Sequence, residues 1–543
     1  MAEPLQRIAE QAIPQVSVQG AIEFSPGLHG VGGTAVSAAS DTQLGVEVQS
    51  PASPEDAESQ FRLGVKFALG QGVRQSYAES AKWFRRAARQ NHIQAICYLA
   101  EMHENGWGVA RDHCEAAGWY RRAAEAGSAA AQNNVGRMHL TGDGARMDLA
   151  AAVKWFRRAA EQEYSRAQYN LGLVFSGGLG AGQDDAKAAE WFRRAAKRGH
   201  VGAQCELGVR YGVGRGLEQD TAKAAKWFRR AADQGNSHAQ LSLGILYFEG
   251  RGVDWNPEEA AKWFELAAEQ GDDEAQFKLG VMYFEGDGVG RDDAKAVDWY
   301  RLAADAGNRR AQNNLGQMYA EGIVVEREPK EAVRLLILAA EQGHPMAQFR
   351  LGWMYFKGRD VQQDDQQAAR WSELAAAQNN SYAQYNLGFM YANGRGVVRD
   401  FVKAIKWFRL AASDDIAEAH SALGDAYARG RGVERNDGEA IKWYRRAADH
   451  GYPDAERMLG DMYAEGRGVE QSDAEASKWW SEAEESSEYC EQTEVIVVRF
   501  APYEDEEEWD AYVVSRDLRE WAGATEIVMP ERDPLRTAPT RHA

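Results

Sequence analysis

The stretch Ala275–Gly307, AQFKLGVMYFEGDGVGRDDAKAVDWYRLAADAG, decides the fold. Its first part places apolar side chains at helical spacing, at Ala275, Leu279, Met282 and Tyr283. This stripe predicts an amphipathic helix over residues 274–284. Gly286 is expected to end that helix, because a left-handed residue is needed there and glycine has no Cβ. Asp292 is expected to cap a second helix, which carries Trp299 and stops at Gly307.

The same pattern recurs along the chain every 36 residues, without an insertion. A tryptophan marks the second helix in eleven of the twelve units, and Leu335 replaces it in the eighth. The position of Asp292 holds Ser, Asp or Asn in eleven units and Glu328 in the other, so nearly every second helix has a capping side chain. Each unit therefore predicts a helix, a tight loop and a second helix.

A lone hairpin of this length cannot bury enough surface to offset its chain entropy, so the hairpins must stack. Stacking should bury the Trp, Tyr and Leu ladders in one continuous core. We therefore expect an all-α fold over residues 55–487: a right-handed α/α superhelical solenoid of twelve helix-turn-helix repeats, with a concave face.

These residues resemble the Sel-1-like repeat family, a branch of the tetratricopeptide-type helical solenoids. The resemblance rests on the recurring A-Q-x-x-L-G-x-x-Y-x-x-G-x-G-V-x-x-D-x-x-x-A-x-x-W-x-x-x-A-A-x-x-G, as in Ala275–Gly307. Members of the family mostly serve as scaffolds and adaptors in multiprotein complexes. The resemblance implies a non-enzymatic scaffold that binds protein partners through the concave groove.

The two flanks lie outside the repeat pattern. Residues 1–54 are rich in Ala, Ser, Gly, Gln and Pro, and we expect a disordered arm. Residues 488–543 are expected to form an acidic cap over the last hairpin or a small mixed α/β element. Within them, Thr493–Phe500 and Ile527–Met529 read as strands, and Trp509–Trp521 reads as a helix.

Composition excludes several classes of protein. The formal net charge of −19 argues against a nucleic-acid binder, because phosphate recognition needs a basic surface. The four cysteines are too few for a disulfide framework. We recognise no signal peptide and no apolar run long enough for a membrane span, and so expect a soluble, cytoplasmic protein.

The sequence offers little sign of catalysis, cofactor binding or metal binding. The Gly-x-Gly-Val loops join helices and lack the lysine of a phosphate-binding loop. Cys97, His103, His113 and Cys114 gather in the second unit, but Cys97 and His103 lie on different faces of one helix, so we predict no zinc site. We expect no catalytic residue, no cofactor and no metal.

The candidate partner-binding residues lie on the first helices. Analogy with the tetratricopeptide groove points to positions −3, −2, +1 and +4 around the recurring Leu-Gly glycine. In the middle units these positions carry aromatic side chains and two cations, which we call the inner row: Phe277, Lys278, Phe284, Phe349, Arg350, Trp353, Phe356, Tyr385 and Phe389. The row suits a peptide with apolar anchors and acidic groups. Alternatively, some of these side chains pack between hairpins.

Two further ladders have a structural and a functional interpretation. Glutamine occupies position −4 in nine units, where it can hydrogen bond to a neighbouring helix or contact a ligand. Arginine pairs recur on the second helices of the first five units, at 85–86, 121–122, 157–158, 193–194 and 229–230. Residues 57–236 carry 27 basic and 18 acidic residues, a net +9, which leaves −28 for the rest. The pairs are solvated faces or a docking site for an acidic partner or the acidic tail.

Units eight and nine break the loop pattern, with Gly322-Ile323-Val324-Val325 and Gly358-Arg359-Asp360-Val361. This is either drift that the repeat tolerates or a local change of curvature. Two other functions stay open besides a general scaffold: a dedicated regulatory or immunity-type binder of one partner, and a hydrolase of peptidoglycan or lactams, an activity sometimes attached to family members. The hydrolase would need a nucleophile beside a base, which the sequence does not show.

Overall fold

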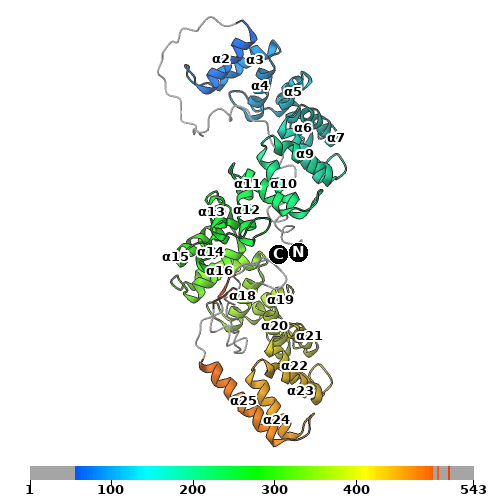
Figure 1. Ribbon diagram of the computed structural model, residues 1–543, viewed down its shortest axis with the longest axis vertical. Coiled ribbons are helices and arrows are strands. Elements are labelled where there is room, and N and C mark those ends of the chain that lie inside the picture. The colour runs from blue at the N-terminus through cyan, green and yellow to red at the C-terminus, as the bar shows by residue number, and fades with distance from the viewer. Residues whose placement is uncertain (1–54, 493–497, 501–510, 514–543) are drawn as a thin grey trace, which may run out of the picture. The chain divides into compact units, whose positions relative to one another are not determined.

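The structure is a computed structural model that describes residues 55–492, 498–500 and 511–513, with the side chains of residues 55–487. The described residues belong to two compact units, one within Met1–Gln270 and one within Gly271–Ala543. Each unit holds six helical hairpins (Figure 1). We call the first helix of a hairpin its A helix and the second its B helix. The expected all-α solenoid of twelve repeats is confirmed.

The helices of the first unit are nearly uniform in length. Its A helices are α2 (Ala57–Leu69), α4 (Ile93–Asn105), α6 (Ala129–Thr141), α8 (Ser165–Gly177), α10 (Val201–Val213) and α12 (Ser237–Glu249). Its B helices are α3 (Tyr77–Arg89), α5 (His113–Glu125), α7 (Leu149–Glu161), α9 (Asp185–Lys197), α11 (Thr221–Ala232) and α13 (Pro257–Glu269).

The second unit repeats the arrangement. Its A helices are α14 (Asp273–Glu285), α16 (Arg309–Glu321), α18 (Pro345–Lys357), α20 (Ser381–Asn393), α22 (Ala417–Arg429) and α24 (Pro453–Glu465). Its B helices are α15 (Asp293–Asp305), α17 (Pro329–Glu341), α19 (Asp365–Ala376), α21 (Phe401–Ser413), α23 (Asp437–Asp449) and α25 (Asp473–Gln492). No helix among the described residues combines the length and apolarity needed to cross a bilayer.

The helix ends follow the expected caps. Gly286 ends α14 with a φ of 79°, and its N–H donates to Met282 O at 2.8 Å. Asp292 caps α15 by accepting a hydrogen bond from the backbone N–H of Lys295 at 3.1 Å. Glu328 is the exception among the B-helix caps, because its side chain makes no capping hydrogen bond. The local signals therefore set the hairpin boundaries.

On most B helices the fully buried aromatic residue is the one that directly follows the ladder tryptophan. Phe84, Phe156 and Tyr300, each directly after a ladder tryptophan, are at most 1% exposed. Trp263 and Trp371 are buried, and the other ladder tryptophans are half-buried, so the expectation that the tryptophan ladder lies in the core was only partly right. The A-helix glycine explains why this residue is buried, since a Cβ on Gly280 would come within 2.7 Å of the Tyr300 ring. The ring packs closely against the A helix because the glycine has no side chain.

The glutamine ladder is structural. Gln348 Nε2 donates to Ala340 O at 3.0 Å, which satisfies a carbonyl near the C-terminus of the preceding B helix. The same bond recurs from Gln132, Gln168, Gln204, Gln240, Gln312 and Gln384. In six repeats the amide oxygen of this glutamine also accepts a hydrogen bond from a second glutamine, at the end of the following B helix. The bonds to the B-helix carbonyl join a hairpin to the preceding one, whereas the bonds between two glutamines lie within one hairpin.

The irregular loops keep the backbone of the regular ones. Val324 and Asp360 replace the second loop glycine and still adopt φ values of 66° and 62°. In a regular loop this glycine sits against the preceding B helix, and a Cβ on Gly396 would lie 1.8 Å from Asp365 O. Asp360 is held by an ion pair with Arg327 at 2.5 Å. The two repeats therefore accommodate a side chain where the others cannot.

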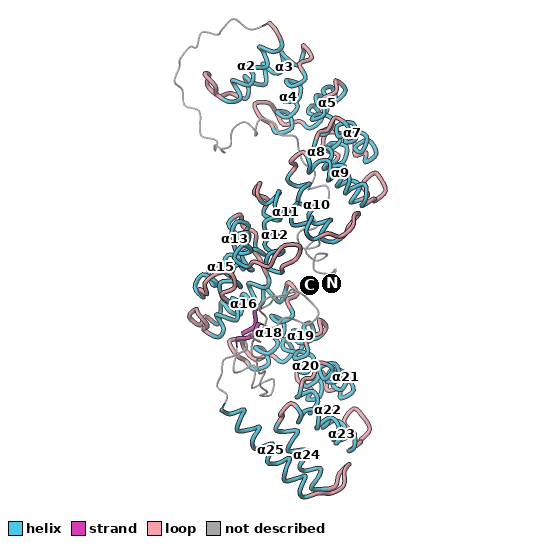
Figure 2. The backbone as a smooth tube through the Cα atoms, viewed as in Figure 1, coloured by secondary structure: helices cyan, strands magenta, loops and turns pink. Residues whose placement is uncertain are grey.

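Two short strands follow the last helix. β1 (Val498–Phe500) pairs antiparallel with β2 (Ala511–Val513), with Arg499 opposite Tyr512. β1 lies within the strand expected over 493–500, whereas β2 lies where a helix was expected, so that helix prediction was wrong at those residues. β2 packs against α16 (Figure 2). The expected N-terminal arm at 1–54 and the expected strand at 527–529 lie outside the described residues.

Candidate partner-binding surfaces

The inner row lies entirely on A helices of the second unit, and most of it is buried. Six of its nine side chains are buried, and Lys278, Tyr385 and Phe389 are half-buried. The buried six are at most 8% exposed: Phe277, Phe284, Phe349, Arg350, Trp353 and Phe356. The structural alternative, packing between hairpins, thus accounts for a large part of the row. Its role in partner binding remains a prediction.

At the start of the row, Phe277 is part of an aromatic pair, a cation–π contact and a neighbouring ion pair. Phe277 lies 5.9 Å from the Tyr300 ring, and the Arg310 guanidinium stacks 4.6 Å from the Phe277 ring. Arg310 pairs with Glu274, and Lys278 Nζ lies 3.7 Å from a Glu274 carboxylate oxygen. Burial tends to raise the pKa of Glu274, but Arg310 and Lys278 outweigh it and lower that pKa to about 2. Lys278 is therefore already engaged by an acidic side chain of the protein itself.

In the middle of the row, Arg350 bonds to the preceding repeat. Its guanidinium donates to the side-chain oxygens of Asn313 and Gln317 on α16. A pocket of about 30 Å³ lies beside it, between α16, α17 and α18, and Trp353 and Asp360 line it. That volume admits a water molecule, far below the roughly 300 Å³ of a small-molecule site.

The end of the row is more open. Tyr385 packs 5.8 Å from Phe408, and Phe389 meets Phe356 edge-on at 6.1 Å. The Arg395 guanidinium lies 3.7 Å from the Phe356 ring. Burial raises the pKa of the Tyr385 hydroxyl, so the group stays neutral. Tyr385 and Phe389 are therefore the aromatic members of the row that keep some exposed surface.

The arginine pairs of the first five repeats form an ordered outer surface. In every one of these repeats the second arginine stacks on the ladder tryptophan of the same B helix. The guanidinium-to-ring distances are 4.5, 5.6, 4.7, 4.6 and 4.6 Å for Arg86, Arg122, Arg158, Arg194 and Arg230. We call these five Arg–Trp pairs the Arg–Trp ridge. Each guanidinium is pre-oriented by the ring below it and is exposed or half-buried.

The same B-helix position is apolar in the next five repeats. There it holds leucine, and the four leucines of the second unit form what we call the leucine row: Leu302, Leu338, Leu374 and Leu410. Leu302 is 50% exposed, and Leu374 and Leu410 are each 41% exposed. Sequence reasoning missed this row, although comparing the repeats position by position would have shown the change from arginine to leucine.

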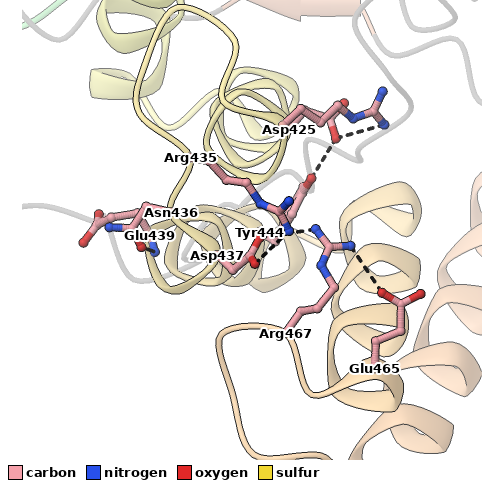
Figure 3. A network of polar contacts seen from close by, with 9 residues as sticks. Asp425, Arg435, Asn436, Asp437, Glu439, Tyr444, Glu465 and Arg467 are labelled. Carbon is pink, nitrogen blue, oxygen red and sulfur yellow. Dashed lines mark hydrogen bonds and ion pairs between the residues drawn. The ribbon is translucent and has the colours of Figure 1, made fainter.

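A polar network joins the last two repeats (Figure 3). Arg435 and Arg467 converge on Asp437, with N–O distances of 3.1 and 3.2 Å. Burial tends to raise the pKa of Asp437, but the hydrogen bonds from both arginines outweigh it and lower that pKa. Arg215–Asp185 and Arg395–Asp365 repeat this bridge. The network is therefore an inter-repeat bridge in which both guanidinium groups are paired with Asp437.

Metal-ligating residues gather at a place that the sequence did not indicate. The candidate zinc ligands of the second repeat, Cys97, His103, His113 and Cys114, are not brought together. Cys97 Sγ lies 3.7 Å from Ser128 Oγ. Instead, Asp415, His420 and His450 place their ligand atoms within 4.8 Å of one another. These residues lie on different elements, around the ends of α21 and α23 and the start of α22. The signal available in the sequence was that all three depart from the usual residues of their repeat positions.

Comparison with known proteins identifies the family. The Sel1 repeat matches twelve consecutive segments, from residues 57–92 to residues 453–487. The chain belongs to the Sel1-repeat family. The solved structure of a protective antigen of uropathogenic Escherichia coli, with the same fold, is 31% identical to this Sel1-repeat protein. The likeness covers 83% of this chain and 97% of the antigen, with a TM-score of 0.68.

Two further structures extend the comparison of this Sel1-repeat protein. A Sel1 repeat protein of Oxalobacter formigenes is 34% identical over 59% of this chain and 92% of its own, with a TM-score of 0.41. An immunity protein of Pseudomonas aeruginosa is 20% identical over 39% and 81%, with a TM-score of 0.27, which carries no functional argument. A comparison with curated proteins finds no match. Sel1-repeat proteins are generally non-catalytic scaffolds for protein interactions.

Proposed function

We propose that this Sel1-repeat protein is a non-enzymatic scaffold that holds at least two protein partners on chemically different surfaces. The observation that carries the proposal is the change at one B-helix position. It is arginine stacked on tryptophan in repeats one to five, mostly exposed leucine in repeats six to ten, and again an arginine stacked on tryptophan, Arg446 on Trp443, in repeat eleven. A binder of one dedicated partner needs one such surface, whereas this chain presents two.

The Arg–Trp ridge suits an acidic partner. Arginine and tryptophan are the side chains most often found at binding hot spots. Stacking on the ring already restricts each guanidinium, so less side-chain entropy is lost when a carboxylate binds. Repeats one to five carry a net charge of +9 in a chain of net −19. Because the contacts are electrostatic and near the surface, binding should weaken as salt is raised.

The leucine row suits a partner with an apolar face, such as an amphipathic helix. Its leucines recur at one position of successive B helices and leave apolar surface in water. The inner row is a further proposed contact for a peptide with apolar anchors and acidic groups. Tyr385 and Phe389 are its best candidates, because Lys278 already pairs with Glu274 and the other six members are buried.

Quantitative affinity capture with three baits separates a scaffold from a single-partner binder. The ridge bait is Arg158→Glu/Arg194→Glu/Arg230→Glu, and the leucine bait is Leu302→Ser/Leu374→Ser/Leu410→Ser. Lys154→Glu/Lys226→Glu is the matched control, because both lysines are exposed on α7 and α11, which also carry two of the ridge arginines. A scaffold should lose one set of proteins with the ridge bait and a different set with the leucine bait.

Other outcomes would contradict the proposal. Loss of the same single protein with both baits would favour a dedicated binder. Capture unchanged by either bait would reject both surfaces. Turnover of peptidoglycan or a chromogenic lactam by the purified chain would show that the protein is a hydrolase and not a scaffold alone.

A further inference from the structure

Asp415 at the end of the tenth repeat and His420 and His450 of the eleventh form a cluster that the proposed partner-binding surfaces do not include. His420 lies in the first half of α22, and His450 is the residue that caps the end of α23. Asp415 follows the end of α21 with a φ of 55°. His420 is 1% exposed, whereas the Asp415 side chain is 77% exposed and His450 is exposed. The cluster therefore has one buried member and an open side facing water.

The three residues replace a recurring structural device. His420 and His450 occupy the two positions that hold the bonded glutamine pair in six other repeats, for example Gln348 and Gln378 at 2.8 Å. His420 keeps part of the original role, since its Nε2 lies 3.1 Å from Ala412 O, as the glutamine amide does elsewhere. The rings of His420 and His450 stack at a centroid distance of 6.1 Å. Two imidazoles are thus placed together where the fold needs only two amides.

The protonation state and position of His420 suit a metal ligand. Its Nε2 lies 3.9 Å from Asp415 Oδ1 and 3.1 Å from Ala412 O, while Nδ1 is buried without a hydrogen-bond partner. A metal ion bound at Nε2 would take the place of the contact with Ala412 O. Burial lowers the pKa of His420, against the opposing effects of Ala412 O and Asp415, so the imidazole stays neutral at pH 7. Neutral imidazole is the form that binds metals.

We infer that Asp415, His420 and His450 form a binding site for a divalent transition metal of the zinc type. The three ligand atoms lie within 4.8 Å of one another, so a modest movement of the two exposed side chains brings all three to one ion. Two imidazoles and one carboxylate suit zinc, nickel or copper rather than calcium or magnesium. Three protein ligands leave an open coordination position, as in metal sites that accept a further ligand. The site does not depend on the proposed scaffold function.

Metal titration of the untagged full chain tests this inference, with Zn²⁺ followed by calorimetry and Co²⁺ followed by absorption. The decisive variant is His420→Gln/His450→Gln, which restores the glutamine pair that six other repeats already contain. It should keep the melting temperature of the metal-free protein and bind Zn²⁺ at least about tenfold more weakly. His238→Gln, a change at an exposed histidine outside the cluster, should bind as the unaltered chain does.

A second variant covers the case in which the double substitution impairs folding. Asp415→Asn removes the carboxylate but keeps a residue that the repeat accepts, since Asn91 and Asn379 adopt the same positive φ at this position. It should also weaken Zn²⁺ binding at least about tenfold. Equal affinity of the unaltered chain and both variants would overturn the site. A thiolate charge-transfer band in the Co²⁺ complex would also overturn it, because the metal would then be bound by cysteines.

Discussion

Gln378 Nε2 donates a 2.8 Å hydrogen bond to Gln348 Oε1 across thirty residues of chain. Gln348 in turn donates to Ala340 O, so one amide joins the end of its own hairpin to the end of the preceding one. The amide is buried, with Gln348 4% exposed, and both of its polar atoms are bonded. A repeat protein depends on such nearest-neighbour interfaces for its stability.

Gln348→Ala should therefore destabilise the second unit by about 2 kcal/mol, because it leaves Ala340 O without its amide partner and opens a small cavity. Gln378→Ala is the matched control, since the Gln348–Ala340 bond survives it, and the loss should be below about 1 kcal/mol. Chemical denaturation of both variants measures the difference. Equal losses would mean that the buried carbonyl bond contributes little.

Val324→Gly should stabilise the protein by about 0.5–1 kcal/mol. A β-branched residue with positive φ pays a backbone cost of about 1–2 kcal/mol, which glycine avoids, while glycine loses about 0.5–1 kcal/mol in chain entropy. Asp360→Gly relieves the same conformation but removes the ion pair with Arg327, so it should give no gain. Thermal melting of the two variants tests this contrast. A gain from both would show that the Asp360–Arg327 pair does not matter for stability.

Glu418 should make stability depend on pH. Burial raises its pKa from the ordinary 4.5 to about 8. Between these pH values the folded protein keeps a proton that the unfolded chain releases. The contribution of this group is therefore fully favourable below pH 4.5 and is lost as pH rises toward 8.

Glu418→Gln removes this dependence. Relative to the unaltered protein, the variant should gain on the order of a few kcal/mol between pH 5 and pH 8. Glu434→Gln, at an exposed glutamate, is the control and should show no such trend. Denaturant unfolding at both pH values is the measurement, and parallel curves for the two variants would rule out a buried neutral carboxyl.

The inner row should divide into packing and binding residues. Phe349→Ala/Trp353→Ala removes two side chains that are each 5% exposed and should cost several kcal/mol of stability through cavities. Tyr385→Ala/Phe389→Ala removes half-buried rings, so it should cost less stability and, if the row binds a partner, should weaken that binding by on the order of tenfold or more. Melting temperature and partner affinity are measured together. Unchanged affinity in the second variant would remove the row from the binding surface.

Position-by-position comparison of the repeats would have identified more of the candidate surfaces than motif searching did. The change from Arg230 to Leu302 at one B-helix position is visible in the sequence, and so are the histidines at two glutamine positions. Neither matches a known motif, because each is a departure from this chain's own repeat. The burial of Arg350 could not be foreseen in this way, since its partners Asn313 and Gln317 lie in the preceding repeat.

The sequence by itself determined the twelve hairpins, their boundaries and the family, because periodic apolar stripes, capping side chains and left-handed glycines act within a few residues of chain. Only the tertiary structure decided which side chains reach solvent and which meet. The aromatic residue after most ladder tryptophans fills the core because the A-helix glycine admits its ring. The inner row is largely buried because successive A helices pack against each other. Asp415, His420 and His450 come together through stacking of hairpins, which brings one B-helix end beside the next A helix. Such contacts depend on packing between repeats, and a local pattern does not contain them.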